Sequence, residues 1–277
     1  MSTIKIIIDE SQDSKPFGSG QRFFEEELEK AKILIVNLIE KSKKIREDNN
    51  QEEYVHQHNT IAILGPRGVG KTSFLLSLRD FINDSEDFNI DRKDNNKKVI
   101  WLPSVDPTRV EKNEIFLAFI VANILRKIRK DKKGNLSQQI LDKLDTLSRD
   151  FAILAPSEVQ EEQWKDLLGD PLTFAYELMN KAHSGLSLAQ SFHEFLKECL
   201  KEMQADAFVQ PIDDVDSAIE QGWPILETIR RYLATPYLIK ILSGDIRLYQ
   251  SVIRKQQVDK LKSLIEVRKN IRLYWKQ

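Results

Sequence analysis

The chain has little cysteine, little net charge and no apolar run long enough to cross a bilayer. Its one cysteine, Cys199, cannot form an internal disulfide, which fits a reducing compartment. The run ILIVNLI at 33–39 is too short for a membrane span, and the first residues, MSTIKIIIDES, lack the basic segment of a signal peptide. A formal net charge of −1 gives no overall field that would attract nucleic acid or lipid. These absences predict a cytoplasmic protein with no membrane partner.

Strand-like and helix-like segments alternate along the chain. Its 277 residues, 41% hydrophobic and 31% charged, are typical of a soluble globular protein with a substantial core. Apolar runs predict strands at 59–64, 99–108, 206–216 and 237–245, and helical spacing predicts helices at 20–47, 114–130, within 135–204, 217–234 and 246–277. Such alternation predicts an α/β fold in which helices flank a mostly parallel sheet on both faces.

Three parts of the chain differ in pattern. Residues 1–48 are expected to hold a strand and a long amphipathic helix. The apolar stripe of this helix suits packing on the core or pairing with a partner helix, and it consists of Phe24, Leu28, Ala31, Ile35, Leu38 and Ile45. Residues 49–245 form the expected core, with an exposed polar loop at 83–98. Residues 246–277 form a basic helix with nine Lys or Arg and two Asp or Glu. This helix suits either nucleic-acid phosphates or, as the favoured reading, packing on another domain or subunit, and it could begin a further region.

The stretch GPRGVGKT at 65–72 has the spacing of a phosphate-binding loop, G-x-x-x-x-G-K-[ST]. An apolar strand precedes it and a helical pattern follows, so backbone N–H groups would wrap a phosphate at a helix N-terminus. The alternative, a chance glycine turn, is disfavoured by these flanks. The residues predicted to contact nucleotide are Gly65, Pro66, Arg67, Gly68, Val69, Gly70, Lys71, Thr72 and Ser73.

Two side chains of this loop have chemical roles in the prediction. Lys71 supplies a positive charge to the β- and γ-phosphates and is counted among the catalytic residues. The Thr72 hydroxyl is placed to ligate Mg²⁺.

A second acidic element is expected at the end of the strand FVQPIDDVD, residues 208–216. Asp213 is the predicted Mg²⁺ ligand with Thr72, and Asp214 is predicted to orient or deprotonate water, a role for which Asp216 is the less favoured alternative. The competing interpretation is that these acids cap a helix starting near Ser217. Pro211 cannot donate to a sheet ladder, so we expect a missing bond or a bulge there.

Weaker candidates follow other strands. Ser243, in YLIKILSGD, is predicted to sense the γ-phosphate, although it and Asp245 also suit a simple polar turn. Asp106 could lie near the nucleotide or could start a helix through its Asp-Pro turn. The arginines considered for charge stabilisation, in cis or from a neighbouring subunit, are Arg230, Arg231, Arg247 and Arg254.

The stretches GPRGVGKTSF, VQPIDDVDS and LIKILSGD together resemble bacterial AAA+-related and STAND-type P-loop ATPases, including the KAP group. WLPSVDPT with EIFLAFIVANIL is similar to ATPase subunits of antiphage defence systems that act with an adenosine deaminase. The resemblance implies the P-loop NTPase three-layer fold, ATP with Mg²⁺, homo-oligomerisation and a protein effector partner. Gln210 and Pro211 depart from the pattern, as does Asp214 where many AAA+ members have Glu, and the shorter acid favours slow turnover.

The favoured function is therefore ATP binding and hydrolysis that switches assembly. The alternatives are an ABC-type ATPase, although HSGLSLAQ at 183–190 lacks the double glycine of a signature loop, and an adaptor that binds nucleotide without turnover. ATP is favoured over GTP because no N-K-x-D motif follows a strand.

Overall fold

The fold is described by a computed structural model that covers residues 4–7, 24–48, 56–85, 88, 97–109, 116–132, 135–154, 171–215 and 219–274. In chain order the elements are β1 (Ile4–Ile7), α1 (Glu25–Asp48), β2 (Thr60–Leu64), α2 (Lys71–Asp84), β3 (Val99–Trp101), the 3-10 helix η2 (Pro107–Arg109), α3 (Phe116–Asp131), α4 (Gln138–Leu154), α6 (Pro171–Met203), β4 (Ala207–Ile212), α7 (Ile219–Arg231), β5 (Leu238–Gly244) and α8 (Ile246–Tyr274).

The described strands form one parallel sheet in the order β1-β2-β5-β4-β3. Strand β5 therefore lies between β2, which enters the glycine loop, and β4, which ends at the acids. Its register pairs Ser243 with Ile63 on one side and Leu242 with Ile212 on the other. Because all strands run the same way, their carboxyl ends meet at one edge, where ligands bind in open α/β sheets.

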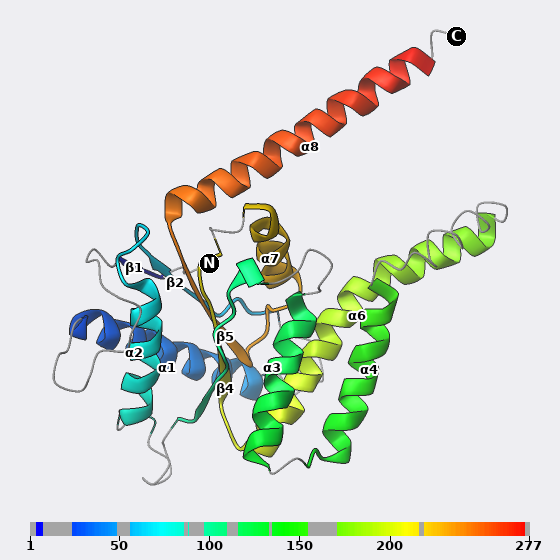
Figure 1. Ribbon diagram of the computed structural model, residues 1–277. Coiled ribbons are helices and arrows are strands. Elements are labelled where there is room, and N and C mark those ends of the chain that lie inside the picture. The colour runs from blue at the N-terminus through cyan, green and yellow to red at the C-terminus, as the bar shows by residue number, and fades with distance from the viewer. Residues whose placement is uncertain are drawn as a thin grey trace.

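Helices cover both faces of the sheet, as Figure 1 shows. Alternate residues of β4 divide between two cores, because successive side chains of a strand point to opposite faces. Phe208 and Ile212 pack with residues of α3, α6 and α7, whereas Ala207 and Val209 pack with residues of α1 and α2. The predicted α/β P-loop NTPase fold, with a sheet flanked by helices, is confirmed.

Helix α1 packs its apolar stripe against the sheet. Leu28, Ala31, Ile35 and Ile39 are buried in the same cluster as Ile61 of β2. The predicted stripe member Leu38 is only half-buried, because a helix of 3.6 residues per turn brings the fourth residue after Ile35 onto the same face. Of the two roles considered for this helix, packing on the core is the one its buried face serves.

The predicted strand 99–108 is shorter than expected. Strand β3 ends at Trp101, and its continuation touches β4 again only through an isolated bridge between Val105 and Ile212. Pro103 and Pro107 interrupt the run, since proline has no N–H to donate to a ladder. Most of the predicted polar loop 83–98, and residues 155–170 of the predicted helical region, lie outside the described residues.

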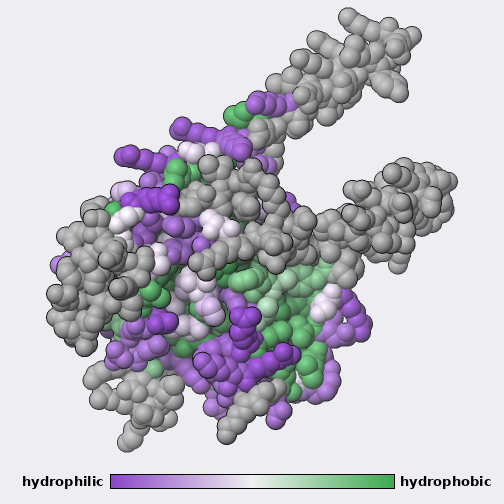
Figure 2. Space-filling view, viewed as in Figure 1, coloured by the Kyte–Doolittle hydropathy of each residue, from purple (hydrophilic) through white to green (hydrophobic). Residues whose placement is uncertain are grey.

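Helix α8 leaves the body of the molecule and projects from it (Figure 1). Ile246, Ile253, Val258 and Leu261 are exposed along its first half. Figure 2 shows hydrophilic side chains over most of the described surface in view, with an apolar region over α3 and α4, where Phe119 and Leu141 are exposed. None of the helices in the described part of the chain has the length and apolar character of a membrane span.

Strand β5 carries a fully buried lysine, Lys240, in register with Thr60 and Gln210. Its Nζ donates to the backbone oxygen of Leu233 at 2.8 Å. Burial lowers the pKa of Lys240 from 10.5 to about 7, because the charged ammonium loses its hydration. The unfolded chain therefore binds more protons than the folded chain between these two pH values, and this lysine makes stability rise with pH across that window.

Replacing Lys240 with methionine should stabilise the fold by about 1–3 kcal/mol at pH 7, because an apolar chain of similar length removes a buried charge. The gain should shrink as the pH rises toward 10.5, where folded and unfolded wild-type chains no longer differ in charge at this residue. Urea unfolding of wild type and Lys240→Met at pH 7 and pH 10 measures both effects. Lys41→Met, at an exposed position of α1, is the matched control. A destabilised Lys240→Met variant at pH 7 would contradict the argument.

Candidate functional site at the carboxyl edge of the sheet

The glycine loop joins β2 to α2 at the carboxyl edge. Its first residue, Gly65, donates its N–H to the oxygen of Gly244 at the end of β5, at 3.1 Å. Gly68 and Gly70 have φ angles of 87° and 85°, a left-handed conformation that favours glycine. Gly70 caps α2, and its oxygen accepts the N–H of Phe74 at 2.8 Å. The two glycines therefore let the chain turn sharply into a helix N-terminus, as the motif predicts.

Lys71 begins α2 and folds back over the loop. It is buried, and its Nζ donates to the oxygens of Gly65 at 3.1 Å and Pro66 at 2.9 Å. The ammonium is therefore held against the first two carbonyls of the loop. Exposure along the loop is uneven: Pro66, Arg67 and Gly68 are exposed, whereas Gly65, Val69, Gly70 and Ser73 are buried.

Thr72 and Asp213 meet across the sheet although 141 positions separate them in the chain. Thr72 Oγ1 donates to Asp213 Oδ2 at 2.6 Å. Asp213 is buried, and its N–H donates to the oxygen of Val105 at 2.8 Å, which fixes the backbone from which the carboxylate extends. The two side chains predicted to share one ion are thus in direct contact.

Ser243, at the end of the central strand β5, is the third member of this cluster. Its buried hydroxyl donates to Asp213 Oδ1, and its Oγ accepts the N–H of Asp214 at 3.1 Å. Asp214 has φ 53°, a left-handed conformation that Asp tolerates better than most residues. Ser243 therefore bridges the backbone of one acid and the carboxylate of the other.

The residues present fit a magnesium nucleotide. Mg²⁺ prefers oxygen ligands, and the Thr72 hydroxyl and Asp213 carboxylate place two such oxygens together at the first turn of α2. The backbone N–H groups there and the Lys71 ammonium suit an anion. Thr72 and Asp213 would hold the ion and Gly65–Ser73 would hold the phosphates. Bound at such a site, magnesium neutralises phosphate charge.

Asp106 and Asp245 each accept a backbone N–H at the start of a helix, which the sequence suggested as an alternative for Asp106 and not for Asp245. Asp106 Oδ1 accepts the N–H of Thr108 at 2.9 Å, at the start of η2. Asp245 Oδ1 accepts the N–H of Arg247 at 2.8 Å, at the start of α8. Asp216 lies outside the described residues.

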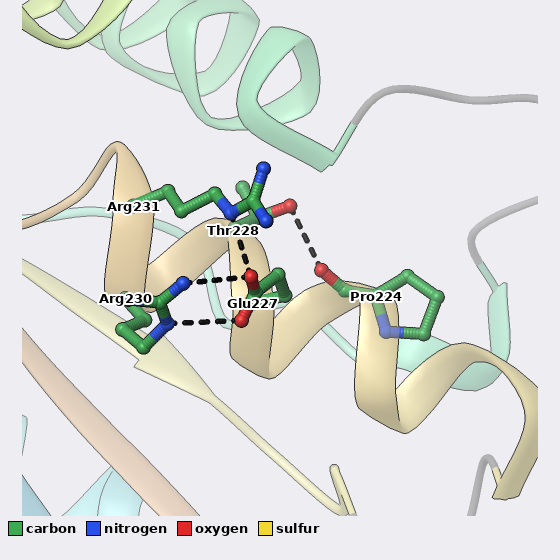
Figure 3. A network of polar contacts seen from close by, with 5 residues as sticks. All are labelled: Pro224, Glu227, Thr228, Arg230 and Arg231. Carbon is green, nitrogen blue, oxygen red and sulfur yellow. Dashed lines mark hydrogen bonds and ion pairs between the residues drawn. The ribbon is translucent and has the colours of Figure 1, made fainter. Parts of the chain in front are cut away.

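The four arginines differ in where they lie. Helix α7 starts after the carboxyl end of β4 and ends before β5 begins, so Arg230 and Arg231 lie at the opposite edge of the sheet. Figure 3 shows Glu227 between them, accepting from Arg230 Nε at 2.9 Å and Arg231 Nε at 2.6 Å. The hydrogen bond from Arg230, aided by Arg231, lowers the pKa of Glu227 to about 2 against the opposing effect of its partial burial. Arg247 and Arg254 instead lie on α8, exposed, beyond the carboxyl edge.

The sequence prediction missed two contacts of the site. Tyr249, in the first turn of α8, donates from its hydroxyl to the backbone oxygen of Ser243 at 3.0 Å. Gly244 supplies the carbonyl that receives the first N–H of the loop. Both contacts use backbone oxygens of β5, which leave no side-chain pattern to read. Only the place of Tyr249 just after SGD could have drawn attention to it.

Comparison with known proteins agrees with this geometry. The family described as KAP family P-loop domain matches residues 34–268, from α1 through most of α8. No curated protein matches the chain at a significant level.

Removing the Thr72 hydroxyl should weaken metal-dependent binding specifically. In Thr72→Val the shape is kept but one oxygen ligand is lost, so affinity for ATP with Mg²⁺ should fall about tenfold, a loss of about 1.4 kcal/mol. Affinity for ATP in EDTA should change less than threefold. Titration with a fluorescent ATP analogue in both buffers gives the ratio. Thr228→Val, which removes a hydroxyl that donates to Pro224 (Figure 3), is the control. Equal losses in both buffers would argue against a metal role.

Proposed function

The chain belongs to the KAP family of P-loop domains, and on this premise we propose that it binds ATP with Mg²⁺ and hydrolyses it slowly, as a switch that controls assembly. Family membership supports nucleotide binding and an NTPase type of activity. The choice of ATP, the slow turnover and the coupling to assembly are our proposals. The single observation that carries the proposed magnesium-nucleotide site is the 2.6 Å contact between Thr72 and Asp213 beside the glycine loop.

In this proposal each residue of the cluster has one task. The ammonium of Lys71 turns from the loop carbonyls to the β- and γ-phosphates, while Thr72 and Asp213 hold the ion. Ser243 keeps the Asp213 carboxylate oriented through its hydroxyl. Asp214 orients the attacking water and takes up its proton, with its backbone held by Ser243. Its side chain is one methylene shorter than Glu, so water is positioned less well and hydrolysis is slow.

The proposed output runs through α8. Ser243 is bonded both to Asp213 and, through its backbone oxygen, to Tyr249 at the base of the projecting helix. A change at the phosphates that moves Ser243 would therefore also move the start of α8. We propose that a further copy of the chain and an effector protein respond to this movement. A role in antiphage defence with an adenosine deaminase stays a prediction from resemblance.

Lys71→Ala tests the site assignment. Removing a charge that contacts phosphates should weaken ATP binding about 10- to 100-fold, and ATP should no longer change the particle mass, while the melting temperature without nucleotide stays within about 2 °C. Binding is measured by fluorescence titration, assembly by mass photometry with and without ATP, and turnover by phosphate release. Lys41→Ala is the control for loss of a surface lysine.

Three outcomes would contradict parts of this proposal. Unchanged ATP affinity in Lys71→Ala would reject the site. Tight binding by wild type with phosphate release at background would reject turnover and support a nucleotide-binding adaptor. Stronger competition by GTP than by ATP would reject the choice of nucleotide.

A further inference from the structure

Strand β4 contains a proline, Pro211, two residues before the first acid, Asp213. On the β3 side, Val209 accepts the N–H of Leu102 at 2.9 Å. Residues two apart on a strand bond to the same neighbour, so Pro211 is the next residue facing that side. Pro211 has no N–H, and the continuation of β3 contains Pro103. The ladder between β3 and β4 therefore lacks one main-chain donor just before Asp213.

The side chain of Gln210 fills this break. Gln210 is fully buried, and its Nε2 donates to the oxygen of Pro103 at 2.9 Å and to the oxygen of Pro211 at 2.7 Å. One amide group thus ties the segment after β3 to β4 in place of the missing main-chain donor.

The tie continues to Asp213. The oxygen of Pro211 also accepts the N–H of Val105 at 3.1 Å, and the oxygen of Val105 accepts the N–H of Asp213 at 2.8 Å. Val105 is buried, so neither bond is readily replaced by water. The backbone that carries the Asp213 carboxylate therefore bonds to a segment that Gln210 also contacts, through Pro103.

The acceptor end of the same amide argues against simple space filling. Gln210 Oε1 is buried and has no hydrogen-bond partner within the described part of the chain. An orphaned buried carbonyl is unfavourable, and a leucine or methionine would fill the volume without it. The hydrogen bonds that Nε2 donates to Pro103 and Pro211 are therefore the feature of Gln210 that an apolar residue could not replace.

We propose that Gln210 is a positioning residue matched to Pro211: its amide replaces the N–H that proline lacks and sets the Asp213 carboxylate for magnesium. The role of magnesium in this inference rests on the proposed function, whereas the hydrogen bonds of Gln210 do not depend on it. Two apparent departures from the family pattern thereby compensate each other. Neither residue touches the nucleotide, so their effect reaches the reaction only through Val105 and Asp213.

A double-mutant cycle tests the match. Gln210→Met keeps the volume and removes the donor. It should raise the Mg²⁺ concentration needed for half-maximal binding of a fluorescent ATP analogue about tenfold. The affinity for the same analogue in EDTA should change less than threefold. Pro211→Ala restores a main-chain donor, so Gln210→Met in that background should raise the requirement less than threefold. Gln139→Met, at an exposed position of α4, is the control. An equal rise in both backgrounds, or no rise in either, would overturn the proposal.

A second measurement separates this inference from the proposed function. Hydrogen exchange of the peptide containing Asp213 is followed without nucleotide, where the N–H of Asp213 is protected by Val105. Gln210→Met should speed its exchange about tenfold, and the change should be smaller in the Pro211→Ala background. If wild type binds no Mg-ATP but exchange behaves in this way, the proposed function fails and the Gln210–Pro211 match stands. If exchange is unchanged, the match fails whatever the nucleotide chemistry.

Discussion

The contact between the Thr72 hydroxyl and the Asp213 carboxylate is the constraint on which the site depends. Thr72 follows strand β2 and Asp213 follows strand β4. These two strands are separated by β5, so they lie about 10 Å apart. Only a short turn into α2 and a carboxylate at the strand end bring their oxygens to 2.6 Å. Strand β5, which lies between them, supplies Ser243, whose hydroxyl donates to the Asp213 carboxylate. The strand order therefore determines which third side chain can meet the first two.

The two edges of the sheet are built differently. At the carboxyl edge, polar groups lie around the glycine loop, where a ligand could join them. At the amino edge a network of neutral side chains joins α1 to the start of β2: Gln57 Nε2 donates to Asn59 Oδ1 at 2.6 Å, and Asn59 Nδ2 donates to Ser42 Oγ at 3.0 Å. Buried networks of this kind favour one packing arrangement, because a shifted arrangement would leave their members unpaired. The network thus fixes how α1 sits against the amino edge of the sheet.

The link from Ser243 to Tyr249 gives the proposed switch a physical route. In that proposal coupling requires a two-state element that both parts of the protein bias, and Ser243 is the residue that bonds to both. Ser243 contacts the acid through its side chain and α8 through its backbone oxygen, so a shift of its backbone would affect both contacts. The amide of Gln210 has the opposite effect in our proposal, since it restrains the other acid-bearing strand. Rigidity on the β4 side would direct movement toward β5 and α8.

Much of this protein was readable along the chain. The glycine loop, its strand and helix, and the acids at 213 and 214 each follow from local spacing, because turns and helix starts depend on neighbouring residues. The pairing of Thr72 with Asp213 was also predicted, as a role shared by two motifs. Only the tertiary structure decided that β1 pairs with β2, that the Tyr249 hydroxyl reaches the oxygen of Ser243, and that the Gln210 amide reaches the oxygen of Pro103. Each of these contacts ends on a backbone oxygen, and a carbonyl is the same in every residue, so its partner is set by the fold and not by a pattern of side chains.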